Sequence, residues 1–85
     1  MDRTLLIIEN VVLGQLAKTV GERGSANLDT KMFLEYEIDS LEALEMILRI
    51  ETELEAHEVF VDFDREKLHE VLTPRELANK MRALV

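Results

Sequence analysis

The residues with the clearest chemical potential are the adjacent Asp39 and Ser40, which begin a run rich in leucine and glutamate. Both side chains are of the types that cap a helix by accepting a hydrogen bond from a free backbone N–H group. A group attached to Ser40 would lie near the positive end of the helix macrodipole, where unpaired N–H groups favour an anion. The pair therefore has two interpretations: ordinary capping, or a serine that is presented for chemistry.

The helix that must position this pair is predicted over residues 40–56. At about 100° per residue, a core-facing stripe with helical spacing is formed by Ala43, Met46, Ile47, Ile50 and Leu54. A second stripe, about 100–160° away by the same arithmetic, is formed by Leu41, Leu44 and Leu48. Beside it lie Glu42, Glu45, Glu51 and Glu55. We expect one buried face and one leucine face edged with carboxylates. The alternative for the leucine face is burial beneath a covering loop.

Residues 3–20 are predicted as the first helix, because Leu5, Ile8, Val12 and Leu16 recur at helical spacing despite many β-branched neighbours. Residues 21–39 then form a nineteen-residue connection, a length that is unusual inside a compact domain and often functional. We expect this connection to pack on the helices through its apolar residues, which are Leu28, Met32, Phe33, Leu34 and Tyr36.

The C-terminal third of the chain predicts two more helices. A short one is expected over residues 64–68, with Asp62 or Asp64 as its cap. Thr73 followed by Pro74 and Glu76 is a capping pattern that begins the last helix, whose inward face we expect to be Leu77, Met81 and Leu84. Residues 1–85 are therefore predicted as one all-α domain: a four-helix bundle with a long loop between helices one and two and a short third helix.

Composition limits the classes of function. The chain has no cysteine, so disulfides and thiolate metal sites are excluded. The net charge of −8 disfavours nucleic acid and anionic lipid and favours basic protein partners. No apolar run approaches the roughly 20 residues of a membrane span, and the start lacks a secretory leader pattern. We expect a cytoplasmic protein that binds no nucleic acid and does not insert into a membrane.

Few other residues suggest chemistry. His57 and His69 have no metal-ligand spacing, and Asp62-Phe63-Asp64 lacks the glycine of a calcium loop. The sequence contains no evident acid–base pair and no glycine-rich phosphate loop. We therefore expect no metal site and no enzymatic activity.

The stretch 33-FLEYEIDSL-41 resembles the attachment motif of acyl carrier proteins, which has Phe, two variable residues, Leu, Gly, an apolar residue and then Asp-Ser-Leu. The order of helices is similar over nearly the whole chain. The resemblance implies a bundle of acyl-carrier type in which a phosphopantetheinyl transferase moves 4′-phosphopantetheine from coenzyme A to Ser40. The thiol of that arm carries acyl intermediates as thioesters. The chain departs from the motif at Tyr36, which replaces the leucine, and at Glu37, which replaces the glycine.

The resemblance also implies a docking surface on the second helix. Counted from the serine, it comprises Asp39, Leu41, Glu42, Leu44, Glu45 and Leu48, which overlap the leucine face found above. The implied partners are the transferase and acyl-transfer or synthase enzymes with basic docking surfaces, and we expect a monomer. A serine is not nucleophilic alone, and His57, the nearest histidine in sequence, lies well beyond the motif. Activation of Ser40 must therefore come from another protein.

Two functions remain open. The first is a stand-alone acyl carrier protein that carries acyl or aminoacyl intermediates on Ser40 in fatty-acid, polyketide or related specialised biosynthesis. The second is an unmodified protein with the carrier fold that acts as a protein–protein interaction adaptor. Glu37 in the glycine position favours the second, because loss of the glycine could change how closely a transferase approaches the backbone.

Overall fold

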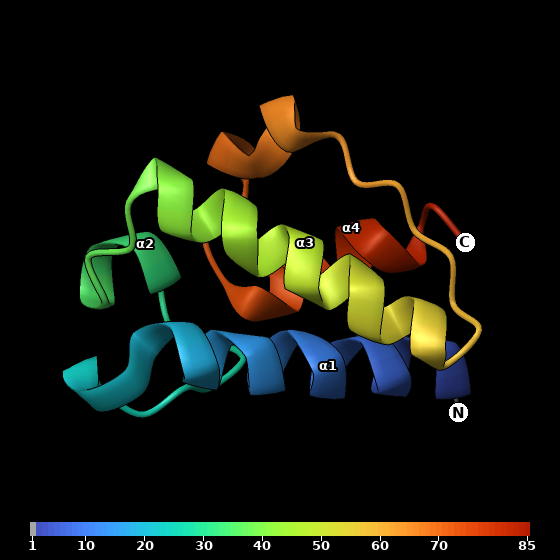
Figure 1. Cartoon of the computed structure of the whole chain (residues 1–85), viewed down its shortest axis with the longest axis horizontal. Helices are drawn as coiled ribbons and strands as arrows, with labels where there is room; N and C mark the ends of the chain where they lie inside the picture. The colour runs from blue at the N-terminus through green and yellow to red at the C-terminus, as the bar shows by residue number, and fades with distance from the viewer. Residues whose placement is uncertain (1) are drawn as a thin grey trace.

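The computed structural model describes residues 2–85, whose regular elements are all helical (Figure 1). Three α-helices of more than two turns form the bundle: α1 (Arg3–Val20), α3 (Ser40–Ala56) and α4 (Pro74–Arg82). Between them lie the one-turn helix α2 (Met32–Glu35) and two 3₁₀ helices, η1 (Gly21–Arg23) and η2 (Arg65–Glu70). The prediction of an all-α bundle with a long connection before the Ser40 helix is confirmed.

Local capping explains where the helices begin and end. Asp2 caps α1 by accepting a 2.9 Å hydrogen bond from the Leu5 N–H, and Gly21 ends the helix at a φ of 57°, which glycine adopts easily. Thr73 caps α4 by accepting from the Glu76 N–H at 3.2 Å. The capping pattern of Thr73 and Glu76 also predicts that the Glu76 carboxylate accepts from the Thr73 N–H, but in the structure it accepts from the Leu72 N–H, one residue earlier.

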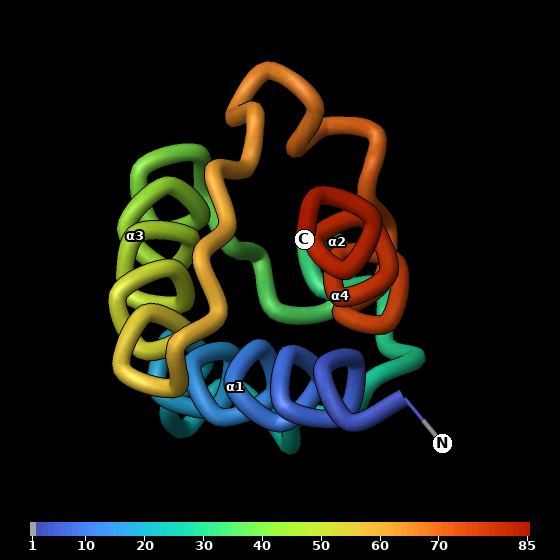
Figure 2. Tube along the Cα trace, turned by 90° about the vertical axis from the view of Figure 1, so that its right-hand side faces the viewer, coloured from blue at the N-terminus to red at the C-terminus, as the bar shows by residue number. Residues whose placement is uncertain are grey.

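The core lies between the three longer helices. α1 packs against both α3 and α4, and Figure 2 shows α1 across the base of the bundle with the other two helices on either side. The predicted core stripe of α3 is confirmed, because all five of its side chains are buried. On α4, Leu77 and Met81 are buried as expected, whereas Leu84 lies beyond the end of the helix and is 53% exposed. Ala78 is buried in its place.

The predicted third helix is η2, a 3₁₀ helix capped by Asp64. The Asp64 carboxylate accepts a 3.0 Å hydrogen bond from the Glu66 N–H, which decides between the two expected caps. The preceding segment, residues 57–64, runs without regular structure beside the second half of α3 (Figure 2). Val59 and Phe63 are its buried anchors.

The connection between α1 and α3 packs down on the bundle, as expected. Met32 and Tyr36 are buried, but Leu34 is 75% exposed and does not anchor it. Two backbone hydrogen bonds tie the connection to the entrance of α4: Met32 N–H to the Leu72 carbonyl at 3.1 Å, and Arg75 N–H to the Leu28 carbonyl at 2.9 Å. The connection that leads into α3 is therefore held against the entrance of α4 at two points.

One property of the first helix corrects the sequence analysis. The stretch Arg3–Arg23 has 21 residues and contains an 18-residue window with a mean hydropathy of 1.2, so by length and composition it could cross a membrane. The expectation that no apolar run approaches that length was wrong. In the structure the apolar residues of α1 serve the core: Ile8, Val12 and Leu16 are fully buried beneath α3 and α4.

Candidate functional site

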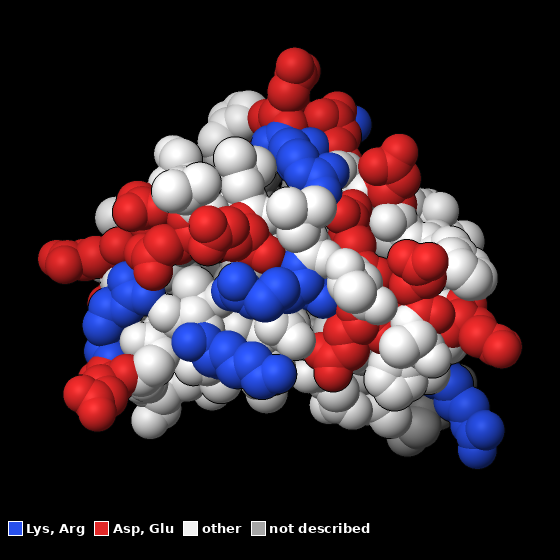
Figure 3. All heavy atoms as spheres, viewed as in Figure 1, with Lys and Arg blue, Asp and Glu red and all other residues white. Residues whose placement is uncertain are grey.

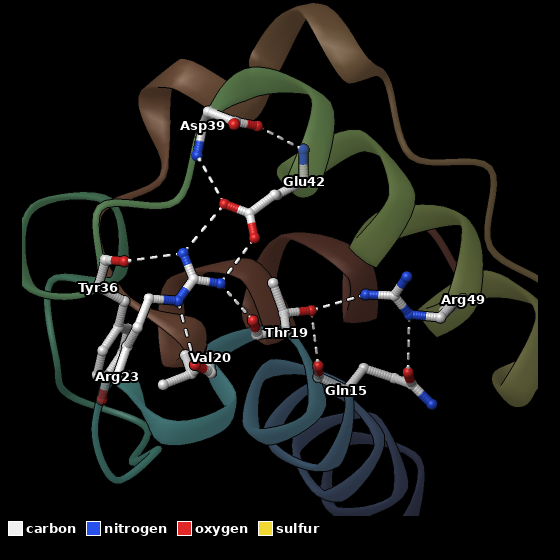
Figure 4. Close-up of polar contacts among 8 residues, drawn as sticks. All are labelled: Gln15, Thr19, Val20, Arg23, Tyr36, Asp39, Glu42 and Arg49. Carbon is white, nitrogen blue, oxygen red and sulfur yellow. Dashed lines mark hydrogen bonds and ion pairs between the residues drawn. The ribbon is translucent and has the colours of Figure 1, made fainter.

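The start of α3 separates the roles of Asp39 and Ser40. The Asp39 carboxylate accepts a 2.8 Å hydrogen bond from the Glu42 N–H (Figure 4). The Glu42 carboxylate in turn accepts a 3.4 Å hydrogen bond from the Asp39 N–H, and the two bonds together form a capping box. Ser40 is the first residue inside the helix and is exposed. Among residues 2–85 its hydroxyl takes part in no side-chain hydrogen bond. The cap is Asp39, and the Ser40 side chain has no part in it.

Arg23 connects the long loop to this first turn of α3. Its guanidinium donates to both carboxylate oxygens of Glu42, at 3.1 Å and 2.7 Å. The same group donates to the backbone carbonyls of Val20 at 3.1 Å and Tyr36 at 3.2 Å, and to that of Thr19 (Figure 4). A planar guanidinium suits this paired recognition of a carboxylate. The loop and the cap of α3 are thereby held as one unit.

The ion pair also changes the acidity of both groups. The hydrogen bond from Arg23 lowers the pKa of Glu42 below its ordinary value, and the Asp39 backbone N–H acts in the same direction. The hydrogen bond to Glu42 raises the pKa of Arg23. Glu42 is thus an ionised carboxylate whose charge is already paired inside the protein.

Glu37 occupies the glycine position of the motif and adopts a backbone that suits glycine. Its φ is 52°, in the left-handed region that side chains with a Cβ disfavour. Its neighbours Tyr36 and Ile38 are both buried, whereas Glu37 itself is exposed. The departure from the motif therefore leaves the backbone turn in place and adds strain to it.

Tyr36, the other departure from the motif, fills a specific place beneath the loop. It is buried, and its hydroxyl donates to the Ser25 carbonyl. The ring lies so close to Gly24 that a Cβ there would approach the Tyr36 Cε1 to 3.0 Å. The larger aromatic side chain is accommodated because Gly24 has no side chain.

The leucine face of α3 is exposed. Leu41, Leu44 and Leu48 are 66%, 37% and 53% exposed, so the alternative that the loop covers them is wrong. Glu45 lies beside them and is exposed as well. Of the six residues expected to recognise partners, these four are open to solvent and uncommitted within the described part of the chain, whereas Asp39 and Glu42 also hold the helix cap.

A groove of about 620 Å³ opens beside Ser40. Its walls are mainly apolar and include Phe33, Leu34, Ile38, Leu44, Leu68 and Leu72, and Asp39 and Ser40 also line it. Arg65 and His69 also line it. Sequence analysis did not associate these two residues with Ser40, because they lie more than twenty positions away and no motif connects them. The fold of η2 over the start of α3 brings them to the groove.

Comparisons with known proteins give one informative result. Residues 10–80 match the family model described as phosphopantetheine attachment site. Comparisons with curated proteins and with solved structures gave no match. The matched range covers α3 with Ser40, both connections and nearly all of α4. The chain therefore belongs to the family of phosphopantetheine-binding carrier domains, in which acyl carrier proteins are found and to which 4′-phosphopantetheine is attached.

Proposed function

We propose that Ser40 carries the 4′-phosphopantetheine group and that the protein is a stand-alone carrier of acyl or aminoacyl intermediates in fatty-acid, polyketide or related specialised biosynthesis. The observation that carries this proposal is the division of roles at the start of α3. Asp39 and Glu42 satisfy the cap between them, so the exposed hydroxyl of Ser40 can be esterified without loss of a structural hydrogen bond.

The surroundings of Ser40 suit a phosphodiester. The first turn of a helix presents backbone N–H groups and the positive end of the macrodipole, and both stabilise an anion. When bound, the group supplies a flexible arm whose terminal thiol holds acyl groups as thioesters. The apolar groove next to Ser40 supports an acyl cargo, because its side chains can shield hydrocarbon from water.

The chain itself is proposed to be a substrate and carrier, not a catalyst. His69 lines the groove, but within residues 2–85 no histidine donates to or accepts from the Ser40 hydroxyl. Activation of the serine then falls to a phosphopantetheinyl transferase. The exposed Leu41, Leu44 and Glu45 give that enzyme, and the acyl-transfer or synthase enzymes that follow it, an apolar anchor and a negative charge.

The test is an intact-mass measurement after incubation with coenzyme A, Mg²⁺ and a broad-specificity phosphopantetheinyl transferase. We expect one phosphopantetheine adduct, located on Ser40 by peptide mapping, and none in the Ser40→Ala variant. An adduct on another residue would contradict the assignment of Ser40.

The competing function is the unmodified adaptor, and the observation that keeps it open is the exposed Glu37 side chain, which stands where the attachment motif has glycine. If a folded sample and its Glu37→Gly variant both stay unmodified, the adaptor becomes the better interpretation. If only Glu37→Gly is modified, the attachment site is intact and the Glu37 side chain obstructs the transferase.

A further inference from the structure

The first helix, α1, has an outer face that points away from the core. At about 100° per residue, Leu6, Asn10, Leu13 and Ala17 fall within about 60° of one another, on the side opposite the buried Val12. Leu6 is 44% exposed, Leu13 is partly exposed, and Asn10 and Ala17 are exposed. Figure 2 shows α1 across the base of the bundle, with α3 and α4 above it, so this face is open to solvent.

This outer face lacks charge, although 33% of the residues of the chain are charged. Residues 4–17 include one charged residue, Glu9, whose side chain is only 17% exposed and pairs with Arg75 at 3.4 Å. Figure 3 shows acidic side chains spread over the face on which α3 lies, whereas mainly uncharged atoms follow the lower edge, where Figure 1 places α1. Two leucines on an uncharged helix face favour contact with another apolar surface.

Gly14 lies beside this face, in the middle of α1, and is exposed. A Cβ at this position would meet nothing within 4 Å, so no contact inside the described chain requires a glycine there. Glycine in the interior of a helix is less stable than alanine. Its missing side chain allows another backbone to approach closely. Gly14 therefore indicates a contact with a molecule outside this chain.

Charge determines which partner fits this face. Two copies of a chain with a net charge of −8 repel each other where their acidic surfaces meet, and the outer face of α1 avoids that repulsion. Arg3 begins α1 and Glu22 follows its end; both are exposed, and neither has an ion-pair partner among residues 2–85. In an antiparallel pair of α1 helices, Arg3 of one protomer lies beside Glu22 of its partner, once on each side of a two-fold axis.

We propose that the outer face of α1 binds the same face of a second copy of this chain in an antiparallel pair. The position midway between Arg3 and Glu22 in the sequence falls beside Leu13. Leu13 of each protomer then packs near the two-fold axis, against the space that Gly14 leaves open on its partner. One helix face is smaller than the roughly 800 Å² per partner of a stable complex. We therefore expect a reversible pair that forms at high protein concentration, beyond the monomer that the sequence analysis expects.

The pair leaves both attachment sites accessible. The groove beside Ser40 is lined in part by Leu68 and His69 of η2. Figures 1 and 2 both show η2 on the far side of the bundle from α1. Two protomers joined through α1 thus carry their Ser40 residues on outward-facing sides. The pairing does not depend on the proposed carrier function.

The test is sedimentation equilibrium of the full chain, from dilute to concentrated solution, which gives the Kd of self-association. We expect Leu6→Glu to raise Kd at least about tenfold, because an apolar contact is lost and like charges are brought together. Leu34→Glu is the matched control: it makes the same change at another exposed leucine, in α2, and should alter Kd by less than about twofold. Equal effects of the two variants would overturn the proposal.

Charge reversal tests the antiparallel arrangement. Glu22→Arg adds two positive charges to −8 and gives −6, so general repulsion between the copies decreases. The proposal nevertheless predicts a Kd raised about fivefold, because the new arginine faces Arg3 of the partner at two places. Arg3→Glu should weaken the pair as well, and the double variant should return Kd to within about threefold of the parent value. A double variant as weak as Glu22→Arg alone would contradict the arrangement.

Gly14→Gln separates association from folding. Glutamine is a better helix former than glycine, so the urea midpoint should stay the same or rise. The bulkier side chain should keep the helices apart and raise Kd about tenfold. A parent chain that is monomeric at every concentration, including one whose α1 binds phosphatidylcholine vesicles instead, would overturn the proposal. These measurements need no modification of Ser40, so their failure is distinct from failure of the mass measurement.

Discussion

The Arg23 guanidinium holds both carboxylate oxygens of Glu42, a residue 19 positions later in the chain (Figure 4). This ion pair joins the first turn of α3 to the loop that precedes it. The resemblance to acyl carrier proteins assigns Glu42 to partner recognition. In this protein Glu42 already has a cation, so a partner that binds Glu42 must compete with Arg23.

Loss of the Arg23 side chain should destabilise the fold and loosen the entrance to α3. Arg23→Ala removes the ion pair and the hydrogen bonds to three backbone carbonyls, so we expect a lower Tm and faster amide hydrogen exchange over residues 36–42. Arg23→Lys should recover part of the loss, because an ammonium keeps the charge but not the two parallel hydrogen bonds. Arg3→Ala, at the exposed start of α1, is the control. Equal Tm values for the two alanine variants would refute the role of Arg23.

Glu37→Gly should stabilise the protein. A left-handed backbone costs an L-residue about 1–2 kcal/mol. Glycine removes this cost, but its greater freedom in the unfolded chain lowers the free energy of unfolding and so offsets roughly half of the gain. We therefore expect a gain of about 0.5–1 kcal/mol in the free energy of unfolding, measured with urea. Glu35→Gly, within α2, should instead destabilise the chain by up to about 1 kcal/mol. A Glu37→Gly variant less stable than the parent would show that the side chain makes a compensating contact.

The glycines at positions 14 and 24 should respond in opposite directions to alanine. Gly24→Ala forces a Cβ to 3.0 Å from the buried Tyr36 ring, so we expect a loss of about 1–3 kcal/mol from overpacking. Gly14 lies inside α1, and a Cβ at this position would have no neighbouring side chain within 4 Å, so Gly14→Ala should add about 1 kcal/mol through helix propensity. Urea unfolding of the two variants measures both changes. A neutral Gly24→Ala would mean that the Tyr36 ring moves aside without cost.

Acid should weaken the fold through three carboxylates whose pKa values are lowered. A hydrogen bond from Arg23 is the main cause for Glu42, one from Arg75 for Asp29, and the Leu5 backbone N–H followed by Arg82 for Asp2. A lowered pKa in the folded state stabilises it above the ordinary values, 4.5 for Glu and 3.8 for Asp. The stabilisation is lost as the pH falls through the lower folded values.

The measurement is Tm against pH from 7 down to 3. We expect a plateau above about pH 5 and a progressive decrease below it. Glu42→Gln should start from a lower plateau and show a shallower decrease, because the group that titrates has been removed. A decrease of the same depth in Glu42→Gln and in the parent chain would exclude Glu42 as a contributor.

The sequence by itself determined the helix that carries the candidate site. The bounds of α3, its buried stripe and its exposed leucines were all predictable, because helical periodicity and capping depend on residues within about four positions of each other. The same is true of the cap at Thr73, since Pro74 and Glu76 lie within three positions of it. Local patterns also indicated the right motif, although they left two residues as possible caps of α3.

The tertiary structure decided how the rest of the chain meets that helix. Arg23 reaches Glu42, and Arg65 and His69 reach the groove of Ser40, only because of the path taken by the loops, and no local pattern encodes that path. Leu84 is exposed because α4 ends at Arg82, two residues before it, and Leu34 lies on the one-turn helix α2, of which only Met32 is buried. Likewise, the sequence shows a glutamate at position 37, but its left-handed φ is seen only in the structure. Hydrogen bonds between near neighbours can be predicted from residue types, whereas contacts between distant segments require the positions of every element between them.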